Sequence, residues 1–259
     1  MKIVVLVKHV PEPTATWRLS ADGTLDRDAV DGRLSQLDEH AVERAVRLVE
    51  GGLAAQITCL TMGPAGAAGS LRKALAMGAD DGVHVCDDAL HGSDAPATSL
   101  VLAAALRRIG FDLVVCGMAA TDAEMSVIPS MLAERLGVPQ ATNAADLRVD
   151  GGTCVVRRDG DAYVEEIVVD LPAVVSVTDQ SGEPRYPAFK AIMASRKKPV
   201  QTWSLADLGV DPAQVGLAVS GTAVLDAQPR PPRTAGTVIV DEGDAAARLA
   251  DFLVAGKLL

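Results

Sequence analysis

Apolar runs alternate with amphipathic stretches over the first 140 residues of the chain. The runs are short, rich in Val, Leu and Ile, and span residues 2–8, 54–61, 83–85 and 111–116. Runs of this kind predict strands that are buried on both faces of a sheet. The stretches between them carry apolar residues at helical spacing. Strands and helices in alternation predict a parallel, right-handed α/β sheet of Rossmann-like kind.

The helix boundaries follow from residues that start and stop helices. Ser35 is expected to cap a helix that has an acidic first turn and ends near Gly51. Its apolar stripe consists of Ala41, Val42, Ala45, Val46 and Leu48. Two further helices are predicted over residues 71–77 and 97–108.

The stretch from Phe111 to Gln140 is the most informative part of the chain. Its apolar run ends at Gly117, small and polar residues follow, and a helix is predicted from Met125 to Leu136. In a doubly wound sheet ligands bind at the carboxyl ends of the strands, and a helix start suits a phosphate. We therefore expect backbone N–H groups of residues 123–126 to hold a nucleotide phosphate. The alternative is an empty junction, as most such junctions in α/β proteins are.

The loop after the first strand, residues 9–32, is unusually long and contains two prolines and an Asp-Gly pair. These features predict a small hairpin outside the sheet. After Gln140 the pattern changes. Residues 147–178 alternate apolar and polar positions and contain Gly-Gly and Asp-Gly pairs, so antiparallel hairpins added to one edge of the sheet are expected.

The last 80 residues are predicted to be irregular. Beyond Asp179 the chain passes a basic cluster, a proline-containing linker at residues 227–236, and a short helix at 244–253. This tail has few apolar residues with which to build a core. We therefore expect one α/β domain over residues 1–226 and an extended C-terminal arm over 227–259 that packs on another chain.

Composition narrows the classes of function. The chain has 259 residues, a net charge of -10 and 49% hydrophobic residues, which fits a globular protein and argues against nucleic-acid binding by general phosphate attraction. No run is long enough to span a bilayer, and the N-terminus lacks the features of a signal peptide, so we expect a cytoplasmic protein without membrane insertion. The four cysteines show no metal-ligand or disulfide spacing and are expected to be buried, reduced thiols. His9 is expected to be a polar residue at a strand end rather than a catalytic base.

Motifs of the common nucleotide-using enzymes are missing. The sequence contains no GxGxxG after the first strand, no GxxxxGK[ST], no GxSxG and no HExxH. No residue is nominated as a general acid, base or nucleophile. A nucleotide-binding chain without such groups is expected to be a carrier or a binding subunit rather than an enzyme.

Several longer motifs carry a family resemblance. Residues 169–211 contain LPAVV, EPRY, IM followed by basic residues, and DLGVD. Four further segments occur in the same order as in one family: VKHVPEP, DEHAVERAVRL and TMGPAGAAGSLRKALAMGAD before this region, and PPRTAG near the end of the chain. In these motifs the chain resembles the electron transfer flavoprotein beta subunit over essentially its whole length.

The resemblance implies a function and partners. In that family the beta subunit forms a heterodimer with an alpha subunit, which holds most of the FAD, and itself holds a buried AMP in a sheet of adenine nucleotide alpha hydrolase-like kind. Electrons arrive from flavin dehydrogenases, such as the acyl-CoA dehydrogenases of fatty acid beta-oxidation, and leave to a quinone oxidoreductase of the membrane. The redox chemistry resides in the flavin, so no residue of this chain is expected to be catalytic.

The resemblance also implies an AMP site. It consists of Leu6, Ser35, Gln36, Leu37, Asp38, Met62, Gly117, Ala120, Asp122, Ala123, Glu124, Met125, Ser126, Val127 and Ile128. Many relatives have Asn-Pro in place of Ser35-Gln36, and a Thr-Gly type sequence in place of residues 126–129. The side-chain contacts of this chain are therefore expected to differ from those of its relatives more than the backbone contacts do.

Residues 183–200 resemble the segment with which the family recognises dehydrogenases. The residues expected to contact a partner are Tyr186, Phe189, Lys190, Ile192, Met193, Arg196 and Lys197. Phe189 stands at the position of the apolar residue that enters the partner's pocket, ringed by basic residues that orient the complex. On the residues alone, an ordinary amphipathic turn of helix is the simpler interpretation.

Three alternatives to the AMP-containing electron carrier differ in what they require of the sequence. A flavin-bifurcating or nitrogen-fixation-linked form of the family would hold a second FAD in place of AMP. An ATP pyrophosphatase would need a Ser-Gly-Gly type loop after the first strand, where VKHVPEP stands instead. A nucleotide-binding stress protein would need a glycine-rich loop before its last helix, whereas GMAATDAEMS has one glycine.

Overall fold

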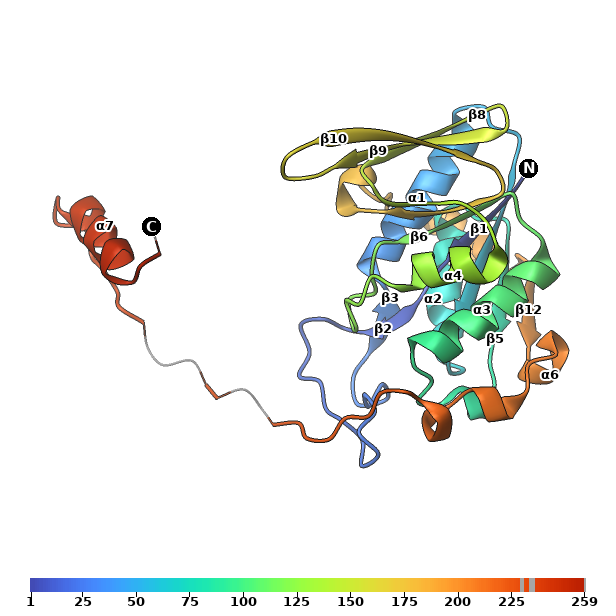
Figure 1. Ribbon diagram of the computed structural model, residues 1–259, viewed down its shortest axis with the longest axis horizontal. Helices are drawn as coiled ribbons and strands as arrows, with labels where there is room; N and C mark the ends of the chain where they lie inside the picture. The colour runs from blue at the N-terminus through green and yellow to red at the C-terminus, as the bar shows by residue number, and fades with distance from the viewer. Residues whose placement is uncertain (229–230, 233–235, 259) are drawn as a thin grey trace. The chain divides into compact units, whose positions relative to one another are not determined.

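The computed structural model describes residues 1–228, 231–232 and 236–258 (Figure 1). Within these ranges the chain forms two compact units, Met1–Leu225 and Asp226–Leu259. The linker predicted at residues 227–236 lies partly outside the described residues.

The larger unit is built on a seven-stranded sheet whose neighbouring strands all pair in parallel. The strands, in spatial order, are β12 (Val200–Trp203), β5 (Asp81–Val85), β4 (Gln56–Met62), β1 (Lys2–Leu6), β6 (Leu113–Gly117), β11 (Ala173–Val177) and β7 (Gln140–Ala144). The predicted α/β fold of Rossmann-like kind is confirmed. The strand order reverses between β1 and β6, and ligands of such sheets bind beside that point.

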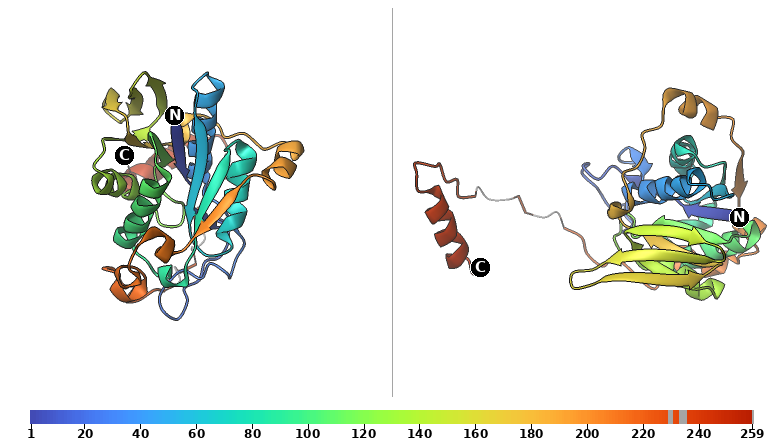
Figure 2. Two further views of the ribbon diagram at one scale, coloured as in Figure 1. Left: turned by 90° about the vertical axis from the view of Figure 1, so that its right-hand side faces the viewer. Right: turned by 90° about the horizontal axis from the view of Figure 1, so that it is seen from above.

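Helices cover both faces of this sheet (Figures 1 and 2). Alternate residues of β1 point to opposite faces, so Ile3 and Val5 belong to one apolar core while Val4 and Leu6 belong to the other. The first core is covered by α1 (Gln36–Glu50) and α2 (Ala67–Met77). The second is covered by α3 (Ala95–Ile109), α4 (Ile128–Leu136) and α6 (Leu205–Leu208).

The antiparallel strands are present, but their placement differs from the expectation. β8 (Asp146–Asp150), β9 (Thr153–Asp159) and β10 (Val164–Asp170) form a separate three-stranded sheet instead of extending the central one, as the view from above shows (Figure 2). Its inner face packs into the core beneath α1 through Leu147, Cys154 and Val156. Strand β11, expected among the hairpins, is a central parallel strand because all five of its residues are apolar or small enough to be buried on both faces.

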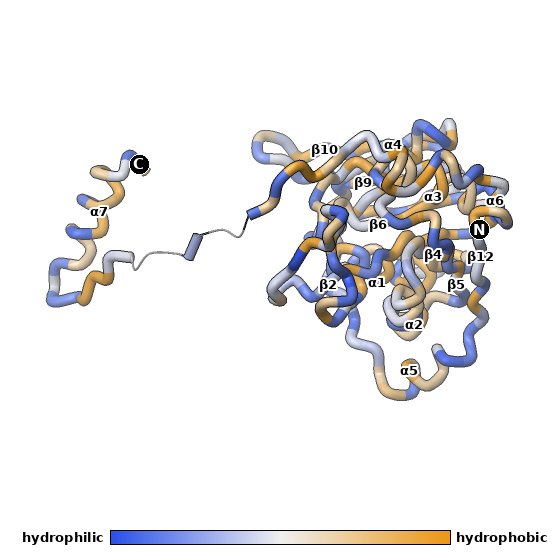
Figure 3. Tube along the Cα trace, turned by 90° about the horizontal axis from the view of Figure 1, so that it is seen from below, coloured by the Kyte–Doolittle hydropathy of each residue, from blue (hydrophilic) through white to orange (hydrophobic). Residues whose placement is uncertain are grey.

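Residues 179–219 are more regular than predicted. They contain α5 (Phe189–Ser195), β12 and α6, with short 3₁₀ turns η2 (Asp179–Ser181), η3 (Pro212–Gln214) and η4 (Leu217–Val219). A capping box at Ser204 and Asp207 starts α6. Helix α5 lies at the periphery of the unit, beside α2 (Figures 2 and 3). Sequence patterns missed these elements because each is shorter than the window that periodicity needs.

The long loop after β1 forms the expected excursion. β2 (His9–Pro11) pairs antiparallel with β3 (Gly32–Leu34), and a bridge joins Leu19 to Leu25 around the Asp-Gly pair. The tip lies against η1 (Asp88–Leu90), because Asp22 pairs with His91 at a distance of 2.8 Å. His9 begins β2 and hydrogen-bonds Ser70 at 2.8 Å through Nδ1, which gives it a partner within the fold.

The smaller unit contains one helix among its described residues, α7 (Ala245–Ala255), close to the predicted bounds of 244–253. No α7 residue is buried in the chain as described, and Leu249, Phe252 and Val254 are more than half exposed. An apolar helix with this exposure lacks a partner surface within its own unit.

Three of the four cysteines are buried, free thiols, as expected: Cys59, Cys116 and Cys154. Cys86 is also free but half-buried. Among the described residues, no helix has the length and apolar character needed to cross a membrane.

Candidate functional site

The carboxyl ends of β1 and β6 meet the start of α1. The Asp38 carboxylate, in the first turn of α1, accepts a hydrogen bond from the backbone N–H of Lys8 at 2.8 Å and from that of Gly117 at 3.1 Å. The carbonyl of Lys8 in turn accepts from the N–H of Ser35 at 2.9 Å. One side chain therefore ties two strand ends to a helix start at the switch point of the sheet.

Gly117 allows this close approach. A Cβ at this position would lie 2.8 Å from Asp38 Oδ1 and 2.8 Å from both the carbonyl carbon and the Cβ of Leu37. Its φ is not positive, so space and not backbone conformation requires glycine here. The predicted residues Ser35, Leu37, Asp38 and Gly117 are thus brought together by direct contact.

Burial raises the pKa of Asp38 to about 7, although the two N–H donors and the nearby Lys8 charge act in the opposite direction. The hydrogen-bond partners of this carboxylate among the described residues are main-chain N–H groups. Its role in the fold is therefore to hold the two strand ends in register.

The loop from Met118 to Val127 is fastened to the same strand end through Asp122. The side chain of Asp122 is 1% exposed and forms ion pairs with Lys8 at 2.8 Å and with Arg27 of the excursion at 2.6 Å. Burial would raise the pKa of Asp122, but the two cations hold it below its usual range. The two cations neutralise this buried carboxylate and are held beside the loop by it.

Helix α4 begins later than predicted, at Ile128 instead of Met125. Glu124 and Ser126 have positive φ values of 51° and 55°, and residues with left-handed backbone conformation interrupt a helix. Residues 123–126 therefore form a loop ahead of the helix and not its first turn. The expected phosphate-binding N–H groups belong to this loop, and the helix start lies at Ile128.

Buried hydroxyl groups without a partner among the described residues surround this region. Ser35 is fully buried at the N-cap position of α1, yet its hydroxyl neither caps the helix nor meets another polar atom of the described chain, contrary to the predicted capping bond. Thr121 Oγ1 in the loop and Thr61 Oγ1 near the end of β4 are buried in the same way. Buried polar groups are normally satisfied, so these hydroxyls mark places where a ligand atom or water fits.

The remaining predicted residues differ in exposure. Leu6, Met62 and Ile128 join the same apolar core, which places them on one face of the sheet. Ala120 and Val127 are half-buried, and five residues are exposed: Gln36, Ala123, Glu124, Met125 and Ser126. Sequence reasoning missed Lys8, Arg27 and Thr121 as members of the site. The signal available for Lys8 was its place one residue beyond a predicted strand end, but nothing in the sequence pairs Arg27 with Asp122, 95 residues away.

The segment predicted to meet a partner presents its apolar side chains to solvent. Tyr186 is 93% exposed and Phe189 is 77% exposed, and Ile192 and Met193 are also exposed. The basic residues Lys190, Arg196 and Lys197 are exposed on the same short segment. α5 is thus a helix whose apolar residues are not buried by the unit that carries it.

A doubly wound parallel sheet with a polar, loop-lined switch point is the architecture of α/β proteins that bind a nucleotide or a similar small ligand. Comparison with known proteins identifies the family. The family model of the electron transfer flavoprotein domain matches residues 22–208. The "Electron transfer flavoprotein subunit beta" of Mycobacterium leprae is 44% identical over 99% of both chains, and that of Mycobacterium bovis is 42% identical over the same shares.

The chain belongs to the electron transfer flavoprotein beta-subunit family, and the predicted resemblance is confirmed. A further relative, the "Caffeyl-CoA reductase-Etf complex subunit CarD" of Acetobacterium woodii, is 32% identical over 92% of each chain. Membership of this family assigns the chain to electron transfer as a flavoprotein component.

Proposed function

We propose that this chain is the beta subunit of a heterodimeric electron transfer flavoprotein that works in the cytoplasm. It accepts electrons from flavin dehydrogenases, with acyl-CoA dehydrogenases as the first class to test, and passes them to a quinone oxidoreductase. The observation that carries the proposal is the 44% identity along 99% of the chain to a beta subunit of this kind. The chain contributes no catalytic residue of its own, because the flavin performs the electron transfer.

In this proposal the chain holds an AMP at the switch point of its sheet, and the alpha subunit holds most of the FAD at the boundary between the subunits. Within the predicted segment 123–126, the backbone N–H groups of Met125 and Ser126 hold the phosphate, since those of Ala123 and Glu124 donate to the Ala120 carbonyl; Lys8 and Arg27 lie beside this loop through Asp122. The hydroxyls of Ser35 and Thr121 supply hydrogen bonds that the described residues leave unsatisfied. These unsatisfied hydroxyl groups support the proposal of a polar ligand at this place.

The alpha subunit is also the proposed partner of the smaller unit. The side chains of Leu249, Phe252 and Val254 are exposed on α7 and need an apolar surface. Burial of the exposed half of each side chain would favour association by roughly 1 kcal/mol apiece before the entropic cost of binding. The segment around α5 is the proposed contact with the dehydrogenase, with Phe189 as its apolar anchor.

A second candidate is a form of the family that holds a second FAD in place of AMP. It is kept because a relative from a caffeyl-CoA reductase–Etf complex is 32% identical. Both forms use the same sheet and switch point, so the bound nucleotide distinguishes them.

The deciding experiment is to purify the chain with the proteins that accompany it in its host, record the visible spectrum, and identify the nucleotides released on denaturation. One FAD and one AMP with a second, larger chain is the expected result. Two FAD would establish the second candidate. A preparation without flavin or partner would refute both.

A further inference from the structure

The EPRY motif, residues 183–186, places an arginine at the root of the exposed segment. Arg185 donates to the Glu43 carboxylate of α1 through its backbone N–H at 3.1 Å and through Nε at 2.7 Å. Its Nη1 and Nη2 donate to Glu50, about two helical turns further along α1, at 2.6 and 2.8 Å. A single guanidinium therefore bridges two carboxylates of one helix, which is a geometry that the planar fork of arginine permits and an ammonium does not.

Two arginines hold the Glu43 carboxylate. Its side chain is 3% exposed, and Arg47 Nε donates at 2.6 Å to Oε1, which also accepts from Arg185 Nη2 at 3.2 Å. Burial alone would raise the pKa of Glu43, but the hydrogen bonds from the two arginines lower it to about 2. Two arginines and two glutamates make a neutral network, which avoids the cost of an unpaired buried charge.

The other end of the segment is fastened to α2. Arg72 Nη1 donates to the carbonyls of Ser195 and Lys198, each at 2.8 Å. Lys198 Nζ donates to the carbonyls of Leu75 and Ala79 at 2.9 and 2.6 Å. The segment is therefore attached at two roots, one on each of two neighbouring helices.

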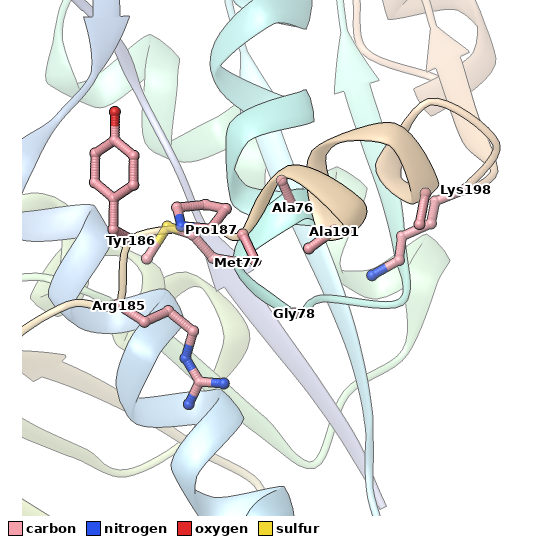
Figure 4. Close-up of a pocket in the computed structure, with 10 residues that line it drawn as sticks. Ala76, Met77, Gly78, Arg185, Tyr186, Pro187, Ala191 and Lys198 are labelled. Carbon is pink, nitrogen blue, oxygen red and sulfur yellow. The ribbon is translucent and has the colours of Figure 1, made fainter.

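Between the two ends of the segment, α5 packs against α2 through small side chains. α5 faces the end of α2 across a hollow lined mainly by small residues, among them Ala76, Gly78, Ala191 and Ala194 (Figure 4). In the same view Arg185 reaches toward α1, whereas the Tyr186 ring points away from the hollow. Each small side chain buries little area, so the hydrogen bonds at the two ends of the segment contribute to fixing its position.

We propose that Arg185 is a positioning residue for the docking of the dehydrogenase: it clamps the segment to α1 through Glu43 and Glu50, so that Phe189 and the basic residues are presented in one arrangement before the partner arrives. The inference rests on the proposed function of α5 as the docking segment. It adds a residue that fixes the start of that segment together with Arg47 of α1, which donates to the Glu183 carbonyl at 3.0 Å.

Loss of the clamp should change affinity without changing the rate of electron transfer in the formed complex. An unclamped segment must be ordered when the partner binds, and the entropy lost in ordering it opposes binding. The side-chain partners of Arg185 are Glu43 and Glu50 of α1 and not the residues of the switch point, so the nucleotide site is unaffected. The expected result for Arg185→Gln is an increase of roughly tenfold in the KM for the flavoprotein as substrate of its dehydrogenase, at unchanged kcat.

The variants should fall in a defined order. Arg185→Lys keeps the charge but cannot bridge both carboxylates, so its KM should lie between those of wild type and Arg185→Gln. Glu50→Gln should have a smaller effect than Arg185→Gln, because Glu50 is half-exposed while Glu43 still holds the clamp. Arg107→Gln, the same chemical change on α3 at the other face of the sheet, is the matched control and should behave as wild type.

A second measurement does not depend on the proposed function. In the purified heterodimer, trypsin should cut after Lys190 roughly fivefold faster or more in Arg185→Gln than in wild type or Arg107→Gln, because the exposed segment opens locally. Thermal unfolding of the same samples checks that the whole protein remains folded, since Arg47 still neutralises Glu43.

The outcomes separate the clamp from its role in docking. Unchanged cleavage at Lys190 would overturn the clamp, and an unchanged KM with faster cleavage would overturn its role in docking. If no flavin dehydrogenase reduces the wild-type heterodimer, the proposed function is refuted together with the docking role, and the cleavage rates still decide whether Arg185 clamps the segment.

Discussion

Gly117→Ala tests whether the switch point depends on the close approach of β6 to α1. The added Cβ would lie 2.8 Å from each of three atoms: Asp38 Oδ1, the Leu37 Cβ and the Leu37 carbonyl carbon. The last of these is a backbone atom. Backbone cannot move aside as a flexible side chain does, so the cost should be about 2–3 kcal/mol, the upper part of the range for overpacked sites. For a chain of this size that corresponds to a fall in Tm of about 4–12 °C.

The substitution should also reduce ligand retention. Relief of the contact requires Asp38 Oδ1 to move, which lengthens its bond to the Gly117 N–H, now 3.1 Å, and separates the two strand ends. The assay is thermal unfolding of the purified protein together with the amount of nucleotide released per chain. Both values should fall in Gly117→Ala.

Gly69→Ala is the matched control because a Cβ there would have nothing within 4 Å and the residue lies in α2. Alanine in place of a helical glycine should stabilise the protein by up to about 1 kcal/mol. The two identical substitutions are therefore expected to act in opposite directions. If Gly117→Ala unfolds at the wild-type temperature and keeps its nucleotide, the reasoning about this contact is wrong.

Three further predictions address other sites. Glu43 has a pKa of about 2 in the fold against an ordinary value of 4.5, so its contribution to stability is present above pH 4.5 and is lost as the pH falls toward 2. Glu43→Gln should therefore lower the free energy of unfolding by about 2–4 kcal/mol at pH 7 and by clearly less near pH 2. Urea titrations at the two pH values measure these losses, and equal losses would contradict the reasoning. Ser35→Ala removes a buried hydroxyl that has no partner among the described residues, so the nucleotide-free protein should be at least as stable as wild type. The dissociation constant of the nucleotide, measured by calorimetry, should rise roughly two- to tenfold. A less stable nucleotide-free protein would argue for a capping role of Ser35 instead. Phe189→Ala should impair reduction by the dehydrogenase and leave the FAD content intact, and unchanged reduction kinetics would exclude Phe189 as the anchor.

Local sequence patterns were sufficient for the elements that are long and regular. The strands of the first 140 residues and helices α1 and α3 were predicted close to their observed bounds, because burial on two faces or on one helical stripe imposes a period on the residues. The end of α2 was predicted too, but α2 starts four residues earlier than predicted, at Ala67. The family motifs were equally readable, because they consist of residue identities in a fixed order. Both the fold class and the family could therefore be predicted from the sequence.

Pairing across long sequence distances could be decided only by the tertiary structure. The residues of β11 predict a strand but do not say that it lies between β6 and β7. Nor do they say that β8–β10 form their own sheet. Both placements depend on which sheet edges and faces remain free once the other elements have packed. The late start of α4 depends on left-handed residues at Glu124 and Ser126 that no local pattern of polar and apolar residues required.

The same division holds at the two sites. The sequence by itself determined that strand ends, a helix start and a loop of small residues would meet at a ligand-binding edge, and that an EPRY motif precedes a basic, apolar segment. Only the folded chain decided that Arg27 meets Asp122 and that Arg185 reaches Glu43 and Glu50, 142 and 135 residues away. The physical reason is that hydrophobic periodicity is imposed locally on the chain, whereas an ion pair needs only opposite charges that the fold happens to bring within about 4 Å.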